Sequence, residues 1–482
     1  MFIGIDLGTS SVKSILVDGG QRLLASATCP LEVQRPAPGH SEQDPEAWWQ
    51  AVLTTLDALR ADQRTAFETT EGIGLSGQMH GAVVLDGKGQ VLRPCILWDD
   101  VRSTAECVAF EEAFPDSRQV TGNLAMPGFT APKLLWLRNH EPAVFERTAK
   151  VVLPKAYVRF RLTGLLIEDM SDASGTLWLD TGARRWSAPA LAATGLGEEA
   201  MPDLVEGNAS AGQMTDDLVR RFGFRRAPVV AGGAGDNAAG AIGLGAISAG
   251  RAFVSLGTSG VLWATTDRFV PYPEAAVHAF CHAVPATWHQ MGVTLSAAAA
   301  LGWWAKVAGA SEADLAGALA DPPKAPSPAT FLPYLAGERT PHNDGAIRGA
   351  FADLSYGADR DALTQAVLEG VAFSFRDCLD ALAKSGTTID EADVIGGGSR
   401  ARVWIGILAS VLGVTLHRLA DGEHGPAFGA ARLARLAVTG EAPEDVCAPP
   451  RRIEAIAPVP ALVDAYAGRF ERYRALYPAL RP

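Results

Sequence analysis

The chain opens with the stretch Phe2-Ile3-Gly4-Ile5-Asp6-Leu7-Gly8-Thr9-Ser10-Ser11-Val12-Lys13, a short apolar strand that leads into a tight polar turn. Apolar residues return at 15–17, and this pattern predicts a β-hairpin with a polar tip. The tetrapeptide of residues 7–10 recurs as Leu256-Gly257-Thr258-Ser259, again between apolar segments. A repeat this far apart predicts two related lobes, each with a Gly-Thr-Ser turn.

These two turns are candidate phosphate sites. Glycine lets backbone N–H groups approach an oxyanion closely, and Thr and Ser hydroxyls add donors. Two such turns that face each other across a cleft could hold a polyphosphate. The alternative is a pair of ordinary hairpins that share four small residues by chance. The candidate phosphate-binding residues are Gly8, Thr9, Ser10, Lys13, Gly257, Thr258 and Ser259.

Length, composition and charge set broad limits on the protein. A chain of 482 residues is too long for one hydrophobic core, so two or three domains are expected. The net charge of -12 argues against a broad nucleic-acid-binding or membrane-binding surface, and an anionic ligand therefore requires a local site with a metal cation. Six scattered cysteines indicate reduced thiols in a cytoplasmic protein. No apolar run is long enough to span a bilayer, and Asp6 comes too early for a signal peptide.

Polar residues follow several predicted strands in the first half of the chain. The strand at 73–75 leads into Gln78-Met79-His80, which places an amide and an imidazole where α/β proteins bind ligands. The alternative is a turn with one packed histidine. Asp99 and Asp100 follow another predicted strand and could bind hydroxyls, with a solvated loop as the alternative. Lys133 stands near the start of a predicted helix, where it opposes the helix dipole and needs some other reason to be there.

The stretch 231–240 surrounds one acid with small residues. Gly232, Gly233 and Gly235 precede Asp236, and alanines and glycines follow it. No bulky neighbour shields this carboxylate, so a substrate can reach it closely. The alternative is that Asp236 serves only as a helix N-cap. The small residues at 241–250 predict a hinge between the lobes.

The second half contains a candidate nucleotide site. A predicted strand ending at Ile395 enters Gly396-Gly397-Gly398-Ser399-Arg400, and a helix follows, so that free N–H groups point at a ligand. Gly397, Gly398, Ser399 and Arg400 are the candidate nucleotide-binding residues. The small residues 425–431 are predicted to form a wall that accepts a flat base. No Gly-x-x-x-x-Gly-Lys-Ser/Thr run is present, which disfavours a P-loop kinase.

Jointly, these motifs resemble the FGGY carbohydrate kinases over essentially the whole chain. The resemblance implies an α/β fold with two actin-like ATPase (ribonuclease H-like) lobes and a cleft between them. The expected lobes are residues 1–245, which bind sugar and phosphate and carry the catalytic Asp, and residues 246–482, which bind ATP. The resemblance also implies ATP, Mg²⁺, a homodimer and a cytoplasmic sugar kinase. It rests on residues 5–10, 77–81, 128–136, 235–240, 255–260 and 396–400.

The resemblance assigns roles to individual residues. Asp236 is the expected catalytic base, and Asp6, together with Asp236, is the expected Mg²⁺ site. The run Gln78-Met79-His80 is similar to that of family members that phosphorylate the C5 hydroxyl of D-xylulose. One departure is Asp99, where Asn is common in the family. The expected sugar-binding residues are Met79, His80, Asp99, Asp236 and Asn237.

Two other functions remain open from the sequence. The sugar could be another ketose or a polyol, such as L-ribulose. From a different class, the chain could be a catalytically silent sugar- or nucleotide-binding regulator, or an actin-like assembly protein. The presence of both Asp6 and Asp236 opposes this second class, because a silent module has no need of the pair.

Overall fold

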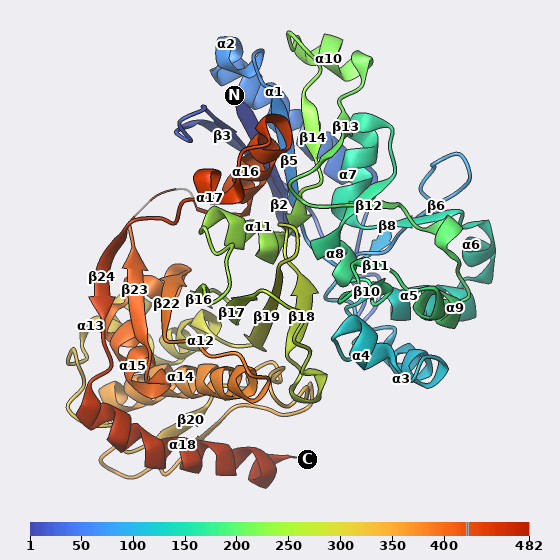
Figure 1. Cartoon of the computed structure of the whole chain (residues 1–482). Helices are drawn as coiled ribbons and strands as arrows, with labels where there is room; N and C mark the ends of the chain where they lie inside the picture. Colours follow the sequence, from blue (N-terminus) through green and yellow to red (C-terminus); the bar gives the residue numbers. More distant parts are fainter. Residues whose placement is uncertain (421, 423, 482) are drawn as a thin grey trace.

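The computed structural model describes residues 1–420, 422 and 424–481, and these form two α/β lobes, one above the other in Figure 1. The large sheet of the first lobe has the strand order β13-β14-β5-β1-β2-β3, with β15 beside β5. The second sheet has the order β18-β19-β17-β16-β22-β23-β24.

The bounds of the strands in the first sheet are β1 Phe2–Leu7, β2 Ser11–Val17, β3 Leu23–Pro30, β5 Gly72–Gly77, β13 Ser210–Gln213, β14 Val229–Ala231 and β15 Ala234–Gly235. Those in the second are β16 Ala252–Leu256, β17 Gly260–Thr266, β18 His278–Cys281, β19 Trp288–Thr294, β22 Glu391–Ile395, β23 Thr415–Leu419 and β24 Arg452–Ile456.

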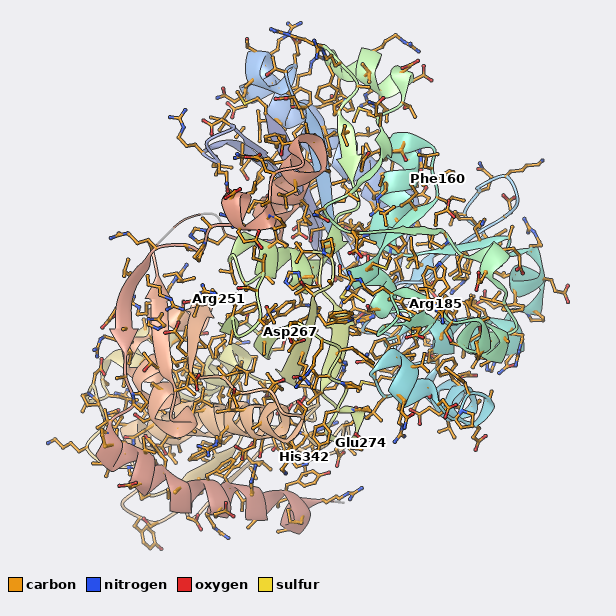
Figure 2. All side chains as sticks on the ribbon, viewed as in Figure 1. Phe160, Arg185, Arg251, Asp267, Glu274 and His342 are labelled. Carbon is orange, nitrogen blue, oxygen red and sulfur yellow. The ribbon has the colours of Figure 1, made fainter. Side chains whose placement is uncertain are left out.

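The two sheets share a pairing pattern that agrees with the predicted repeat. Strand β1 pairs antiparallel with β2 and parallel with β5, and β16 pairs in the same way with β17 and β22. Residues 8–10 and 257–259 are the turns of these two hairpins. One detail of the prediction was wrong, because Lys13 lies within β2, opposite Asp6 in the ladder, and not in the turn. Figure 2 shows Arg251 and Asp267, which flank the second hairpin, near the centre of the view.

Helix α16 (Pro426–Thr439) comes from the second half of the sequence but packs on β1 and β5 of the first sheet. Its small residues Ala427, Ala430 and Ala431 are fully buried there. The prediction that residues 425–431 form a wall for a base was therefore wrong for these three alanines, because small side chains at these positions let the helix lie close to the sheet. The lobe boundary between residues 245 and 246 stays a prediction.

The close approach of α16 depends on glycines in the sheet. A Cβ placed on Gly74 would lie 1.8 Å from the backbone oxygen of Ala430, and one on Gly4 would lie 1.8 Å from that of Ala427. We expect Gly74→Ala to lower the free energy of unfolding by about 1–3 kcal/mol, because the helix backbone must move away from the sheet. Urea denaturation measures this loss.

A matched control for this substitution is Gly468→Ala in the exposed part of α18 (Pro460–Leu480). No heavy atom lies within 4 Å of the added Cβ there. This control should be more stable than wild type by about 0.5–1 kcal/mol, because alanine is the better helix former. A Gly74→Ala protein as stable as the control would contradict the packing argument.

Other helices surround the two sheets (Figure 1). Helix α11 (Asp236–Gly243) extends into the predicted hinge 241–250. Residues 241–243 are therefore helical, and the hinge prediction was wrong for these three residues. Among the described residues, no helix is both long enough and apolar enough to cross a membrane. The longer helices are α1 Pro45–Asp62, α3 Thr104–Ala113, α5 Thr130–His140, α7 Pro154–Thr163, α12 Ala298–Ala308, α14 Arg360–Lys384 and α15 Arg402–Leu412. Shorter helices used below are α8 Met170–Ser174 and α13 Glu312–Gly317, and short strands are β9 Ile167–Asp169 and β20 Thr330–Leu332.

Candidate active site

The candidate site lies where β1, β5 and β15 end side by side. Asp6 of β1 stands opposite Ser76 of β5, and Ser76 stands opposite Ala234 of β15. The Ser76 hydroxyl donates a hydrogen bond of 2.8 Å to Asp6 Oδ1. Asp236 follows β15 directly and begins α11. The sheet thus brings together the carboxylates of Asp6 and Asp236, which are 230 residues apart in the sequence.

Asp236 is the first residue of α11 and not its cap. The N-cap of α11 is Gly235, so the prediction's alternative of a cap-only role was wrong. Asp236 Oδ1 accepts hydrogen bonds from the backbone N–H of Asn237 at 2.7 Å and from its side-chain amide at 2.9 Å. Burial, and then the negative charge of Asp6, raise the pKa of Asp236 to about 6. A carboxylate with such a pKa is a stronger base than usual and is still ionised at neutral pH.

The Asp6 and Asp236 pair also fits a divalent cation. The two groups are close enough for the charge of Asp6 to raise the pKa of Asp236. Two like charges in a buried setting repel each other, and a cation beside them relieves that repulsion. Carboxylate oxygens are the ligands that Mg²⁺ takes in phosphoryl-transfer sites. The predicted Mg²⁺ residues therefore lie together and have suitable chemistry.

Met79 and His80 form the turn after β5 and pack against the small residues near Asp236. A Cβ on Gly235 would lie 2.8 Å from Met79 Sδ, and one on Gly175 would lie 2.5 Å from His80 Nδ1. His80 has a φ of 70°, which is rare for a residue with a side chain and is a form of local strain found at ligand sites. Only glycine at 175 and 235 leaves room for this turn.

The protonation of His80 follows from its contacts. Its Nδ1 lies 2.7 Å from the carbonyl oxygen of Gly175, which can only accept, so Nδ1 carries the proton. Burial lowers the pKa of His80 to about 3, and the nearby charges of Lys133 and Arg339 act in the same direction. The ring is therefore neutral, and its Nε2 is an acceptor suited to a hydroxyl group.

The structure explains the unusual position of Lys133 in α5. Its fully buried ammonium donates to the carbonyl oxygens of His80 at 2.9 Å and Gly128 at 2.7 Å. The Thr130 hydroxyl donates to the same His80 oxygen at 3.1 Å. Burial lowers the pKa of Lys133 to about 7. Lys133 therefore holds the His80 turn in place. This contact explains why a lysine stands near the start of a helix, against the helix dipole.

Arg339 is a candidate residue that the sequence analysis missed. It belongs to the second half of the chain, yet its charge lowers the pKa of His80. Its Nη1 lies 3.3 Å from Nε2 of His278 in β18. The only sequence signal was the polar run Gly337-Glu338-Arg339-Thr340 after a strand, which does not show which elements it will face. The two halves of the chain therefore both contribute to the site.

Asp99 and Asp100 have different surroundings. Asp99 Oδ2 accepts a hydrogen bond of 2.7 Å from Arg35, while Oδ1 is buried and has no hydrogen-bond partner in the part of the chain that the structure describes. Asp100 is fully buried and accepts hydrogen bonds from Arg102 and from the backbone of Ser41. Asp100 is thus neither a sugar ligand nor part of a solvated loop, whereas one carboxylate oxygen of Asp99 is buried and lacks a hydrogen-bond partner among the described residues.

In the first Gly-Thr-Ser turn, the carbonyls of Thr9 and Ser10 and the Thr9 hydroxyl are already engaged. Thr9 Oγ1 donates to Gln78 Oε1 at 3.0 Å and accepts from Trp98 Nε1 at 2.9 Å. The carbonyl of Thr9 accepts from Gln43, and that of Ser10 from the N–H of Leu31. Within the described residues, the N–H groups of Thr9 and Ser10 donate no hydrogen bond, so the backbone donors remain for a ligand.

The second Gly-Thr-Ser turn lies against the predicted nucleotide segment. A Cβ on Gly396 would lie 2.6 Å from the oxygen of Leu256 and 3.1 Å from the nitrogen of Gly257. Gly397–Arg400 form a 3₁₀ turn before α15, in which the Ser399 hydroxyl donates to the carbonyl of Gly396. The N–H of Ala298, at the start of α12, donates to the carbonyl of Gly257 at 2.8 Å.

A cavity of about 530 Å³ opens beside this second turn, a volume typical of small-molecule sites. It lies between α12, α13 and the start of α15. Three of the four predicted nucleotide-binding residues line it, namely Gly397, Gly398 and Arg400. The other lining residues are Ala298, Leu301, Glu312, Ala313, Ala316, Gly317, Leu319, Asp321, Ala401, Arg402, Val403 and Trp404.

Comparisons with known proteins agree with this architecture. The N-terminal and C-terminal domain models of the FGGY family of carbohydrate kinases match residues 1–243 and 252–438. The xylulose kinase of Escherichia coli (strain K12) is 46% identical over 100% of this chain and 99% of its own length. A crystal structure from Brucella ovis described as a "xyloylose kinase" is 54% identical, covers 99% of both chains and has a TM-score of 0.97. The structure of a xylulose kinase from Rhodospirillum rubrum is 30% identical, covers 100% of this chain and 99% of its own, and has a TM-score of 0.91.

These matches confirm the predicted fold class of two actin-like ATPase lobes. They cover both Gly-Thr-Ser turns, the His80 turn, Asp236 and the 396–400 segment. The chain therefore belongs to the FGGY family of carbohydrate kinases.

Proposed function

We propose that the chain transfers the terminal phosphoryl group of ATP to the C5 hydroxyl of D-xylulose, with Mg²⁺. The observation that carries this proposal is the packing of the Met79-His80 turn onto Gly235, directly before Asp236, at the edge where Asp6 also lies. A sugar held by this turn has a hydroxyl within reach of the Asp236 carboxylate. The relatives named xylulose kinase support the choice of sugar.

The residues of the first lobe would act on the sugar. Asp236 accepts the proton of the attacking hydroxyl, and its raised pKa suits this role. The neutral His80 ring accepts a hydrogen bond from a sugar hydroxyl through Nε2, and Asp99 and Asn237 bind further hydroxyls. Met79 supplies an apolar wall against the carbon chain. Arg339 adds a donor from the second half of the chain.

The residues around the two turns would hold the nucleotide. The backbone N–H groups of Thr9, Ser10 and residues 257–259 bind the β- and γ-phosphates, Gly8 lets the first turn approach them closely, and Lys13 adds positive charge nearby. Gly397, Gly398 and Arg400 bind the adenosine part in the 530 Å³ cavity, and Ser399 belongs to the same turn. Asp6 and Asp236 would hold Mg²⁺, which when bound offsets negative charge on the transferring phosphoryl group.

The two halves of the chain, 1–245 and 246–482, would work as lobes that close over both substrates. Closure excludes water, which would otherwise accept the phosphoryl group. We place the reaction in the cytoplasm, because all six cysteines are free thiols. We also propose a homodimer, as the family resemblance implies.

The test is ADP release from Mg-ATP with D-xylulose, L-ribulose, glycerol and gluconate as acceptors. We expect D-xylulose to give a kcat/KM at least about tenfold above the others, because a site that binds specific hydroxyls rejects analogues that misplace them. A higher value for L-ribulose would keep the kinase chemistry and overturn the choice of sugar. If ATP binds but no acceptor stimulates ADP release, the kinase proposal fails and a regulatory binding protein replaces it.

A further inference from the structure

A cluster of charged side chains is fully buried next to the segment that carries Asp236. Lys155 of α7 has its ammonium 2.6 Å from Glu168 Oε1, 2.6 Å from Asp169 Oδ2 and 3.4 Å from Asp172 Oδ2. The exposure of all four side chains is at most 1%. Groups buried in this way have a large desolvation cost, so their position next to the site calls for an explanation.

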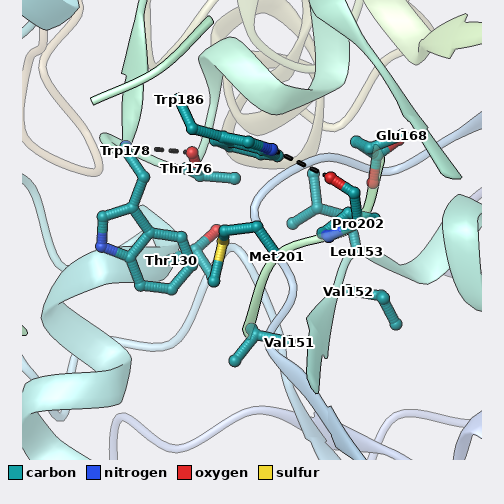
Figure 3. A pocket seen from close by; sticks show the side chains of 10 residues that line it. All are labelled: Thr130, Val151, Val152, Leu153, Glu168, Thr176, Trp178, Trp186, Met201 and Pro202. Atoms are coloured by element: carbon teal, nitrogen blue, oxygen red, sulfur yellow. Dashed lines mark hydrogen bonds between the residues drawn. The ribbon is translucent and has the colours of Figure 1, made fainter. Parts of the chain in front are cut away.

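The cluster is closed and leaves no place for an external cation. The ligand atoms of its three carboxyl groups lie within 4.8 Å of one another, a spacing that could hold a metal ion. The Lys155 ammonium already lies against these oxygens. Figure 3 shows the cavity beside Glu168, which measures about 10 Å³ and offers room for at most about one water molecule. The cation is therefore part of the chain.

Opposite charges lie in contact within the cluster. Arg159 brings a second positive charge, with Nη1 4.0 Å from Glu168 Oε1. Burial, opposed by Lys155 and assisted by the other two carboxylates, raises the pKa of Asp172 well above its usual range. Removal of one member of a buried ion pair leaves its partner without compensation, so the side chains of the cluster hold one another in place.

The cluster holds the backbone just before Asp236 at two points. The Ser171 hydroxyl donates to Asp169 Oδ1 at 2.5 Å and accepts the N–H of Gly235 at 3.1 Å. Arg159 donates to the carbonyl oxygen of Gly232. The segment 232–235 is thus fixed at both ends by side chains of the cluster, and Asp236 follows immediately.

We propose that Lys155, Arg159, Glu168, Asp169 and Ser171 form a positioning network that holds Asp236 in the geometry needed for phosphoryl transfer. This inference rests on the proposed function, in which Asp236 accepts the proton of the sugar hydroxyl. Ser171 is the link between the charges and the backbone of Gly235. A base must lie within hydrogen-bond reach of the proton that it abstracts, and a displacement of about 1 Å can cost up to about a hundredfold in rate.

The network should affect the chemical step more than binding. The His80 turn is held by other groups, namely the ammonium of Lys133, the hydroxyl of Thr130 and the carbonyl of Gly175. Loss of the Ser171 hydroxyl leaves these contacts in place. The sugar can therefore still bind while the carboxylate of Asp236 is less well placed.

The experiment compares Ser171→Ala with a matched control, Ser174→Ala, in the same helix α8. Ser174 is equally buried, and its hydroxyl accepts the N–H of Cys281 at 3.0 Å instead of that of Gly235. With D-xylulose and Mg-ATP, we expect Ser171→Ala to lower kcat by about tenfold, with both KM values within about twofold of wild type. Ser174→Ala should change Tm to a similar extent and keep kcat within about twofold.

Two further measurements keep the proposal open to refutation. Ser171→Cys preserves the volume with a weaker acceptor and should give an intermediate kcat, which covers the case in which Ser171→Ala does not fold. Hydrogen exchange should be faster for peptides that contain Gly235 in Ser171→Ala and unchanged there in Ser174→Ala. Equal kcat losses in the two alanine variants, or a wild-type kcat in Ser171→Ala, would overturn the network. A wild-type protein that phosphorylates no sugar would instead overturn the proposed function.

Discussion

Asp236→Asn should lower kcat by about 10²- to 10⁴-fold, the range typical for removal of a general acid or base. The amide has nearly the same shape as the carboxylate, so the hydrogen bonds to Asn237 and the start of α11 can persist. What is lost is the ability to take the proton of the attacking hydroxyl. Steady-state ADP release with D-xylulose measures the effect, and Tm together with ATP affinity shows that the variant is folded.

The pH dependence separates loss of the base from a general disturbance. The pKa of Asp236 is about 6 because the group is buried and lies beside Asp6. In the wild type, kcat/KM for Mg-ATP should therefore fall below about pH 6, since that parameter reports the enzyme before the metal-nucleotide binds. The residual activity of Asp236→Asn should lack this acidic limb. A variant that keeps the full rate and the same limb would show that another group accepts the proton.

The two hairpins with Gly-Thr-Ser turns could be predicted from sequence because their signals are local. Alternating apolar residues define β1 and β2, and the glycine between them marks the turn. The same local pattern repeats in β16 and β17. A pattern confined to residues 2–17, or to residues 252–266, needs no information about distant parts of the chain.

The assembly of the site depends on long-range strand pairing, which local patterns do not reveal. Asp6 and Asp236 come together because β5 pairs with both β1 and β15. The family resemblance implied that both residues act together, but spacing along the chain did not. Arg339 was missed for the same reason. Its partner His278 lies 61 residues away in the sequence, and its neighbour His80 lies 259 residues away.

The small residues of α16 show how one pattern can serve two purposes. Alanines and glycines allow close approach, whether of a flat base or of another backbone. The complementary glycines at 4 and 74, in strands that come early in the chain, decide between the two, and they accept the backbone of α16. A prediction that considered the segment alone had no means to make this distinction.

The charged cluster was not predicted, because Lys, Glu and Asp are exposed by default. Lys155 follows Pro154 at the start of an amphipathic helix, a position that suits a solvent-facing residue. Its partners come from the segment 168–172, which reads as a polar turn. Only the packing of α7 and α8 against the same strand, β9, makes these residues a buried network.

Lys155→Met should lower the free energy of unfolding by about 3–5 kcal/mol, as is typical when one partner of a buried ion pair is removed. Methionine fills a similar volume without the charge, so the cost arises from Glu168 and Asp169, which lose the ammonium 2.6 Å away. Urea denaturation measures the loss. The exposed Lys306 in α12 provides the control, since Lys306→Met should change stability by less than about 0.5 kcal/mol.

The double variant Lys155→Met/Glu168→Gln tests whether charge is the cause. If the uncompensated anion is responsible, removal of the Glu168 charge should make the double variant more stable than Lys155→Met alone, since groups in direct contact are strongly non-additive. If the loss instead comes from poorer packing, the second substitution adds a further defect and stability falls again. The first result would show that the cost arises from the anions that lie 2.6 Å from the Lys155 ammonium in the wild type.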